Sequence, residues 1–264
     1  MPSPSPARLL AQLLLLGNFK EVVALQRLLS VFEAAVDLPP THWSAAQDLR
    51  DPYDARAILA AVQGAAKEGI VPKIMRIRPP VFYSATWFPS ADCEVLYSLQ
   101  VETKGEFEGA AIPLFVGLVD KLASTFLVEW GHVDVRFPYQ DPKTFTKPWG
   151  CYDHASYYLQ VGPLTLYPRT VLGPRLLALA PGIPSLLGDI SAPCRTLPNG
   201  CLQVDLVHEP WSSTPQALKT AQIALCEALQ PVGLLARPHG RDDFLPGTSW
   251  LPPTIEDATK YKVP

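Results

Sequence analysis

Hydrophobic and polar residues follow two rhythms along the chain, and these predict where strands and helices lie. Residues 7–16 form a mostly apolar run of the length of a buried strand. In residues 22–36 the apolar side chains return every three or four positions with polar residues between them, which predicts an amphipathic helix. A second helix is expected to begin at Asp51 and Pro52 and to end at Gly69.

β-Branched and aromatic residues mark the strands that complete the first half. Residues 70–83 and 94–102 are rich in them and are separated by turn-forming Pro, Ser and Asp, so two antiparallel strands are expected. Helical spacing returns in residues 112–126, and alternating apolar residues predict a further strand at residues 133–137. Residues 1–137 are therefore predicted to run β-α-α-β-β-α-β.

The second half, residues 138–264, is less regular. Residues 138–152 are rich in Pro and aromatic side chains, which is typical of a loop that covers a surface. Residues 157–167 have the character of a strand, and residues 172–180 that of a short helix. Beyond Ala236 a proline-rich tail is expected to lie along the surface.

A turn and a helix start are the clearest local signals of this half. Asn199-Gly200 lies between two runs of strand character and predicts a β-hairpin. Thr214 followed by Pro215 is typical of an N-cap and a first helical residue, and Pro231 ends the helix that follows. The whole pattern predicts an α+β fold of mainly antiparallel sheets with helices packed on one side, in which the two β/α halves form one compact unit.

Composition and charge exclude two classes of partner. The 264 residues are 48% hydrophobic, which is ample for a core, and the formal net charge is only −3. No run of Lys or Arg could follow a phosphate backbone, so nucleic acid is not an expected partner. No segment reaches the roughly 18 apolar residues of a membrane span, and no small-residue cleavage site follows residues 7–16. We expect a cytoplasmic protein.

The cysteines indicate a reduced protein. There are five of them, an odd number, widely spaced and without a CxxC pair. Neither a disulfide framework nor a zinc ribbon is implied, and all five thiols are expected to be free.

Two groups of side chains offer chemistry that an enzyme would use. Cys151 stands three residues before His154, as a thiol and a base, although catalytic pairs of this kind usually come from separate parts of a fold. Asp205, His208 and Glu209 are a candidate metal or acid–base group, yet strand alternation points Asp205 and His208 to opposite faces. Nucleotide-binding, hydrolase and zinc-protease motifs are absent from the sequence, so no cofactor, metal or enzymatic activity is expected. An enzyme built on one of these groups is the alternative.

Several stretches resemble one known family. They are the first strand and helix through Glu33, VEWGHV at residues 128–133, GPLTLY at residues 162–167, LPNGCLQVDL at residues 197–206 and the helix that leads to GLL at residues 233–235. In this order the sequence resembles the bacterial immunity proteins of polymorphic toxins and type VI secretion effectors, in particular the Immunity-52 group and the type VI immunity family. The resemblance implies a protein that binds and neutralises a cognate toxin, often a nuclease-like one.

An inhibitor of this kind needs aromatic anchors and complementary charge, and four loop aromatics offer anchors: Trp149, Tyr152, Trp211 and Trp250. The substrate groove of a nuclease-like toxin must be basic, because it holds phosphates. We therefore expect the toxin-binding surface to use carboxylates around one indole. The residues assigned to it are Asp205, Glu209, Trp211, Asp242 and Asp243.

Overall fold

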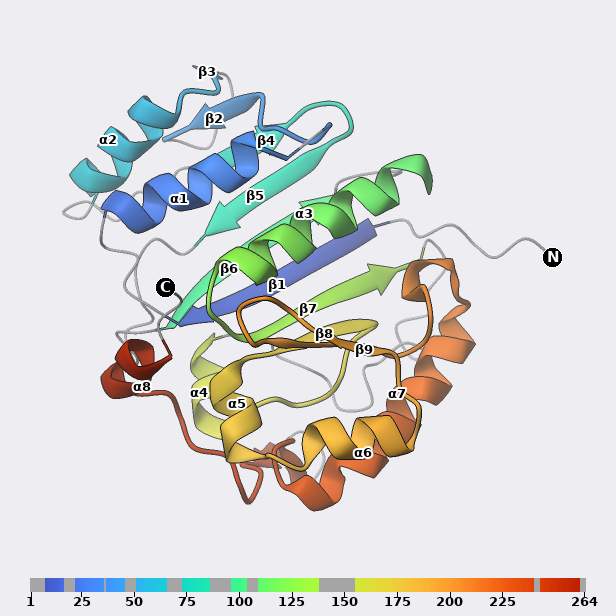
Figure 1. The fold of residues 1–264 in the computed structure, drawn as a ribbon. Coiled ribbons are helices and arrows are strands. Elements are labelled where there is room, and N and C mark those ends of the chain that lie inside the picture. The colour runs from blue at the N-terminus through green and yellow to red at the C-terminus, as the bar shows by residue number, and fades with distance from the viewer. Residues whose placement is uncertain are drawn as a thin grey trace.

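In the part of the chain that the structure describes, a large antiparallel sheet of ten strands organises the fold (Figure 1). The computed structural model describes residues 8–16, 22–35, 37–45, 51–65, 73–85, 96–103, 109–137, 155–239 and 243–261. The strands are β1 (Arg8–Leu16), β2 (His42–Ser44), β3 (Asp51–Pro52), β4 (Lys73–Arg76), β5 (Val81–Ala85), β6 (Leu96–Thr103), β7 (Val128–Arg136), β8 (Arg169–Leu172), β9 (Cys194–Thr196) and β10 (Leu202–Asp205). Their order across the sheet is β3-β2-β4-β5-β6-β1-β7-β8-β10-β9.

The first strand lies at the centre of this sheet, between β6 and β7. Leu13 of β1 is opposite Leu99 of β6 on one side and Gly131 of β7 on the other. Along β1, Leu9 and Leu13 are almost fully buried whereas Leu10 is only partly buried. Because successive side chains of a strand point to opposite faces, the odd-numbered face of β1 carries the main core.

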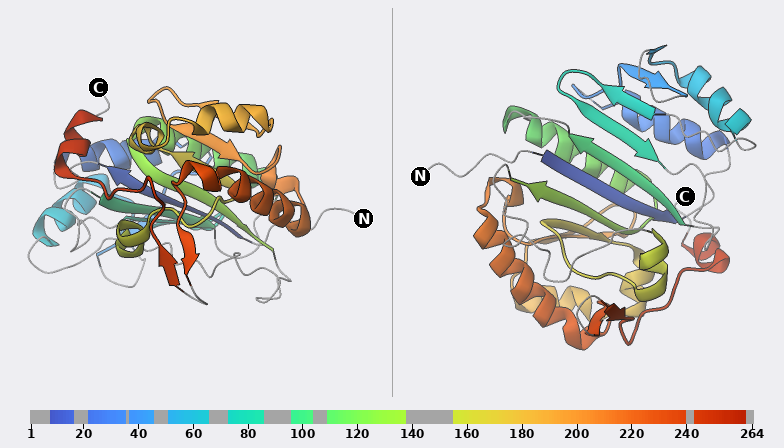
Figure 2. Two further views of the ribbon diagram at one scale, coloured as in Figure 1. Left: turned by 90° about the horizontal axis from the view of Figure 1, so that it is seen from below. Right: turned by 180° about the vertical axis from the view of Figure 1, so that it is seen from behind.

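Helices cover that core face. The helices are α1 (Val22–Glu33), α2 (Ala55–Ala65), α3 (Ile112–Thr125), α4 (Ala155–Val161), α5 (Pro174–Leu179), α6 (Ile183–Asp189), α7 (Pro215–Leu229) and α8 (Ile255–Lys260), with short 3₁₀ turns η1 (Gly109–Ala111), η2 (Pro210–Ser212) and η3 (Gln230–Val232). α1, α3 and α5 lie on one side of the strands, and α4 lies on the other (Figure 2). The predicted α+β fold, with mainly antiparallel strands, is confirmed.

The first half follows the predicted order with extra strands. β1, α1 and α3 lie where the apolar pattern places them, whereas β7 begins at Val128, before the strand predicted at residues 133–137. Asp51 and Pro52 do not start a helix, because they form the edge strand β3. Asp54 instead caps α2, since its carboxylate accepts hydrogen bonds from the amides of Arg56 and Ala57 at 2.9 and 3.1 Å. The strand expected at residues 70–83 is a hairpin of β4 and β5.

The second half contains the larger corrections. The Asn199-Gly200 hairpin joins β9 to β10, and the Thr214 side chain caps α7, both as predicted. The strand expected at residues 157–167 is wrong, because this segment begins with α4 and continues as irregular chain to β8. The tail is more ordered than predicted: it forms a two-stranded sheet of β11 (Arg237–His239) and β12 (Asp243–Leu245), and then α8. It also buries Trp250, which is 5% exposed.

The described residues include only part of the segments to which two further predictions apply, the loop of residues 138–152 and the five free cysteines. The loop of residues 138–152 lies outside the described residues, as do Cys93 and Cys151. Within the described ranges, Cys194, Cys201 and Cys226 are free thiols. No helix of the described chain is long and apolar enough to cross a lipid bilayer.

Candidate functional site

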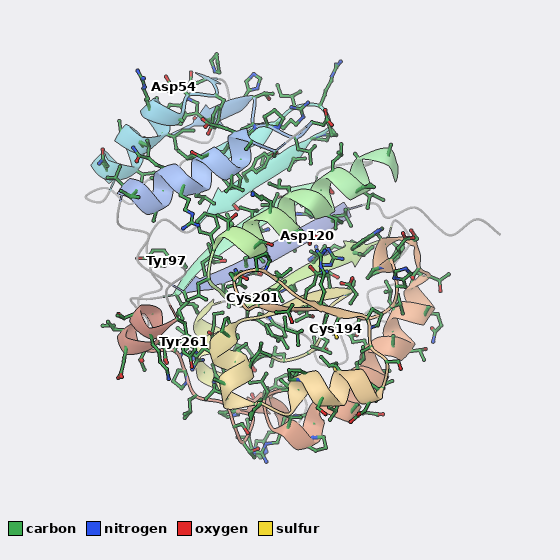
Figure 3. All side chains as sticks on the ribbon, in the orientation of Figure 1. Asp54, Tyr97, Asp120, Cys194, Cys201 and Tyr261 are labelled. Atoms are coloured by element: carbon green, nitrogen blue, oxygen red, sulfur yellow. The ribbon has the colours of Figure 1, made fainter. Side chains whose placement is uncertain are left out.

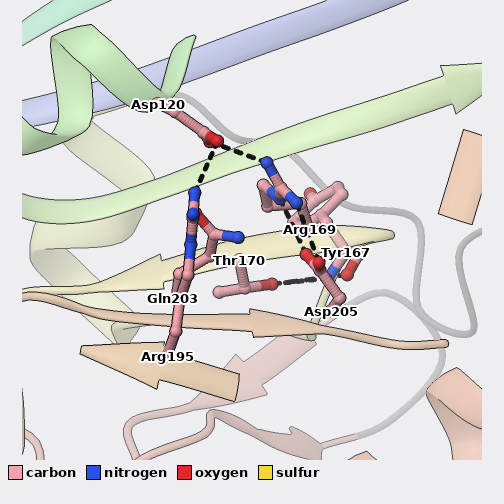
Figure 4. Close-up of polar contacts among 7 residues, drawn as sticks. All are labelled: Asp120, Tyr167, Arg169, Thr170, Arg195, Gln203 and Asp205. Carbon is pink, nitrogen blue, oxygen red and sulfur yellow. Dashed lines mark hydrogen bonds and ion pairs between the residues drawn. The ribbon is translucent and has the colours of Figure 1, made fainter. Parts of the chain in front are cut away.

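A buried arginine gathers side chains from four elements at one end of the sheet (Figure 4). Arg169 of β8 donates from Nε and Nη2 to the two oxygens of Asp205 on β10, at 2.7 and 2.8 Å. Its Nη1 donates to Asp120 of α3 at 2.6 Å. The second oxygen of Asp120 accepts a hydrogen bond from Arg195 of β9 at 2.5 Å, and Arg195 also donates to Gln203 of β10 at 3.0 Å. We call these five residues the arginine cluster.

Strand register explains why this cluster forms. Arg169 and Asp205 are directly opposite one another in the β8–β10 ladder, so their side chains leave the same face of the sheet. Arg169 is also opposite Val133 of β7, whose side chain belongs to the main core. The guanidinium therefore enters the face that α3 covers, where Asp120 meets it. Gln203 and Arg195 form the next such pair, in the β10–β9 ladder.

The cluster is electrically balanced and tightly held. Burial alone would lower the pKa of Arg169, but the hydrogen bonds and charges of Asp205 and Asp120 outweigh it and raise that pKa. The Arg169 side chain is 7% exposed, and its guanidinium carbon lies 4.7 Å from the ring centre of Trp211. Arg195 is the exposed member, with 53% of its side chain accessible. The cluster therefore offers a partner the anchored guanidinium of Arg195, and the Trp211 ring lies beside it against Arg169.

The structure brings two of the five expected binding residues together. Asp205 and Trp211 both contact Arg169, one through a bidentate ion pair and the other through its ring. Because both oxygens of Asp205 are bound, this residue offers little free negative charge to a partner. Glu209 is exposed and stands at the start of η2 with a left-handed backbone, at φ 51°. Asp243 is exposed in the separate β11–β12 sheet, and Asp242 lies outside the described residues.

The candidate catalytic groups gain no support from this geometry. Cys151 and His154 lie outside the described residues, as do Trp149 and Tyr152. His208 is exposed in the irregular chain after β10. Across the described ranges, no group of three or more His, Cys, Asp and Glu side chains is placed to hold a metal ion.

A second buried network escaped the sequence analysis. Glu129 of β7 is 1% exposed and accepts hydrogen bonds from Arg175 of α5, the shortest at 2.6 Å, and from the Tyr158 hydroxyl of α4 at 3.0 Å. Arg175 also donates to the carbonyl of Leu251 at 2.8 Å and stacks over Trp250 with 5.3 Å to the ring centre. The network therefore ties both faces of the sheet to the C-terminal tail.

Burial dominates the electrostatics of this second network. Complete burial raises the pKa of Glu129, and the hydrogen bonds and charge of Arg175 oppose that rise. Burial and the charge of Glu129 raise the pKa of Tyr158 as well, so its hydroxyl remains a donor. A lone Glu in the otherwise apolar VEWGHV stretch is the sequence signal for such a pair, because buried carboxylates are rarely left without a cation.

Comparison with known proteins gives one informative likeness. No protein-family model matches the sequence. No curated protein matches it either. Among solved structures, the Pseudomonas aeruginosa T6SS protein PA0821 has a similar fold, with a TM-score of 0.50 and 15% sequence identity, over 98% of this chain and 83% of that one. At this identity the likeness shows the fold alone.

Proposed function

We propose that this protein is an immunity protein of a type VI secretion system, which binds a cognate toxin protein and blocks it without chemical turnover. One observation carries the proposal. A chain whose order of sequence patterns resembles the type VI immunity family folds, over 98% of its length, like a T6SS protein. Such a protein would meet its toxin in the cytoplasm of the producing cell.

Side chains that are already fixed in the free protein suit an inhibitor that covers a surface of its partner. Binding costs less when the contacting groups are already fixed in the free protein. Arg195 is exposed yet anchored by Asp120 and Gln203, and Trp211 is half-buried against Arg169. Arg and Trp are the residue types that most often dominate interface energies. This face is consistent with a preorganised contact for a toxin.

Co-expression tests the proposal. The genes next to the gene for this protein are searched for those that encode secreted proteins. Each of these neighbours would be expressed alone and together with this protein. Rescue of growth, together with a stable complex in size-exclusion chromatography, is the expected result. An Arg195→Ala variant that folds normally but dissociates faster would place the arginine cluster in the contact. If this protein restores growth against none of the neighbouring gene products and forms no complex with any of them, it is not an immunity protein of this kind.

A further inference from the structure

The far edge of the sheet carries an open groove that neither the arginine cluster nor the buried Glu129 network uses. Its volume is about 610 Å³. Its walls come from the end of α1, from β2, from the edge strand β3 and from the start of α2. The side chains that define it are Glu33, Trp43, Asp51, Tyr53 and Asp54, and we call it the acidic groove. Asp54 lies at this end of the molecule, well away from Asp120 (Figure 3).

The groove is negatively charged. Among the residues that the structure describes, three carboxylates and one cation, Arg56, line it. Glu33 and Asp51 are exposed, so both side chains are accessible to a partner. Burial, followed by the charge of Glu33, a hydrogen bond with Glu33 and the charge of Asp54, raises the pKa of Tyr53, as expected where the local potential is negative.

Aromatic rings complete the groove. Trp43 and Tyr53 are both half-buried and line the same space as the carboxylates. A guanidinium or ammonium group is attracted both by carboxylates and by the faces of aromatic rings, and these attractions add where the two kinds of side chain share a wall. A neutral or acidic partner gains neither, so the lining selects for a cation.

We propose that the acidic groove is a docking surface for an Arg- or Lys-bearing segment of the toxin. The inference rests on the proposed function for the identity of the partner and on the groove itself for the chemistry. A toxin whose active surface binds phosphates carries such basic segments, and a complementary acidic surface speeds association and occupies them. The groove lies at the β3 end of the sheet, so a partner bound there leaves the arginine cluster at the β9 end free for a second contact.

Charge-neutral isosteres test the groove without altering its shape. The probe is acetylated hexa-arginine amide, titrated into the protein by calorimetry at low salt. The variant Glu33→Gln/Asp51→Asn removes two exposed groove charges. The control Asp189→Asn/Glu227→Gln removes two exposed charges from α6 and α7. We expect at least tenfold weaker binding for the groove variant and less than twofold weakening for the control. Equal weakening of both, or no binding to the wild-type protein, overturns the inference.

The growth assay separates this inference from the proposed function. If the wild-type protein rescues growth and the groove variant rescues it equally at limiting expression, the groove is not the contact, although the function stands. If hexa-arginine binds at the groove but no neighbouring toxin is neutralised, the function fails and the cation-binding groove stands. Weaker rescue by the groove variant than by the control supports both.

Discussion

Removing Arg175 tests how the sheet and the C-terminal tail are held together. In Arg175→Ala, the Glu129 carboxylate keeps the Tyr158 hydrogen bond but loses its cation while remaining buried. The carbonyl of Leu251 loses its donor at the same time. Breaking a buried pair by deleting one partner typically costs about 3–5 kcal/mol, because the other charge is left uncompensated. We expect the free energy of unfolding to fall by about that amount.

The same number gives the expected shift in melting temperature. For chains of this size a change of 1 kcal/mol moves the midpoint by roughly 2–4 °C, so Arg175→Ala should melt roughly 6–20 °C lower. Urea unfolding monitored by circular dichroism measures the free energy, and thermal scans measure the midpoint. Arg56→Ala is the control, because this arginine is exposed on α2. The double variant Glu129→Gln/Arg175→Met removes both charges and should recover part of the loss.

The pH dependence identifies the cause. Burial raises the pKa of Glu129, and loss of Arg175 should raise it further. A carboxyl group with a raised pKa contributes most to stability when it is protonated, and that contribution is lost as the pH rises through the raised value. The destabilisation by Arg175→Ala should therefore be larger at pH 8 than at pH 5. A loss of less than about 1 kcal/mol, or one that is the same at both pH values, would refute the buried-pair reasoning.

Three further predictions concern other parts of the molecule. Trp211→Ala removes the ring over the buried guanidinium and should lower the free energy of unfolding by about 1–2 kcal/mol in urea. A variant of unchanged stability would contradict this role of the indole. Cys194 is exposed and should react with iodoacetamide in the native protein. Cys201 and Cys226 are buried, and burial raises the pKa of Cys201 to about 11, so both should react only after unfolding. Peptide mass spectrometry tells these outcomes apart. Asn199→Ala removes two hydrogen bonds that the side-chain amide donates to carbonyls at the end of α3. The free energy of unfolding in urea should fall by about 1–3 kcal/mol. A smaller fall would mean that water replaces these hydrogen bonds.

Elements that carry their own local signals were predictable from sequence. Thr214 and Pro215 fix the start of α7 by capping and by the backbone preference of proline, and Asn199-Gly200 fixes a turn. Neither depends on distant contacts. α4 shows the opposite case, because Tyr157 and Tyr158 favour strands by propensity. The buried side chains of Tyr158 and Val161 are three residues apart, which suits one face of a helix, and tertiary packing decides the outcome.

The candidate site was predictable only in fragments. Asp205 and Trp211 were expected to act together, but the residue that joins them, Arg169, lies 36 positions before Asp205 and 49 after Asp120. Pairs of this kind arise from strand order and register, which no local pattern encodes. Asp51 and Pro52 were interpreted as a helix start, but they form the edge strand β3, and the groove that Asp51 and Pro52 line depends on this strand.

The small net charge of −3 conceals an uneven distribution over the sheet. At the β9 end, Asp120 and Asp205 are paired with Arg169 and Arg195, and the arginine cluster is neutral. At the β3 end, the described part of the acidic groove contains three carboxylates and one arginine. Because screening in physiological salt confines electrostatic attraction to about 8 Å, a partner senses the charge of one end and not the average. A basic partner would therefore be drawn to the β3 end first, and the neutral end would contribute through the fixed geometry of its side chains.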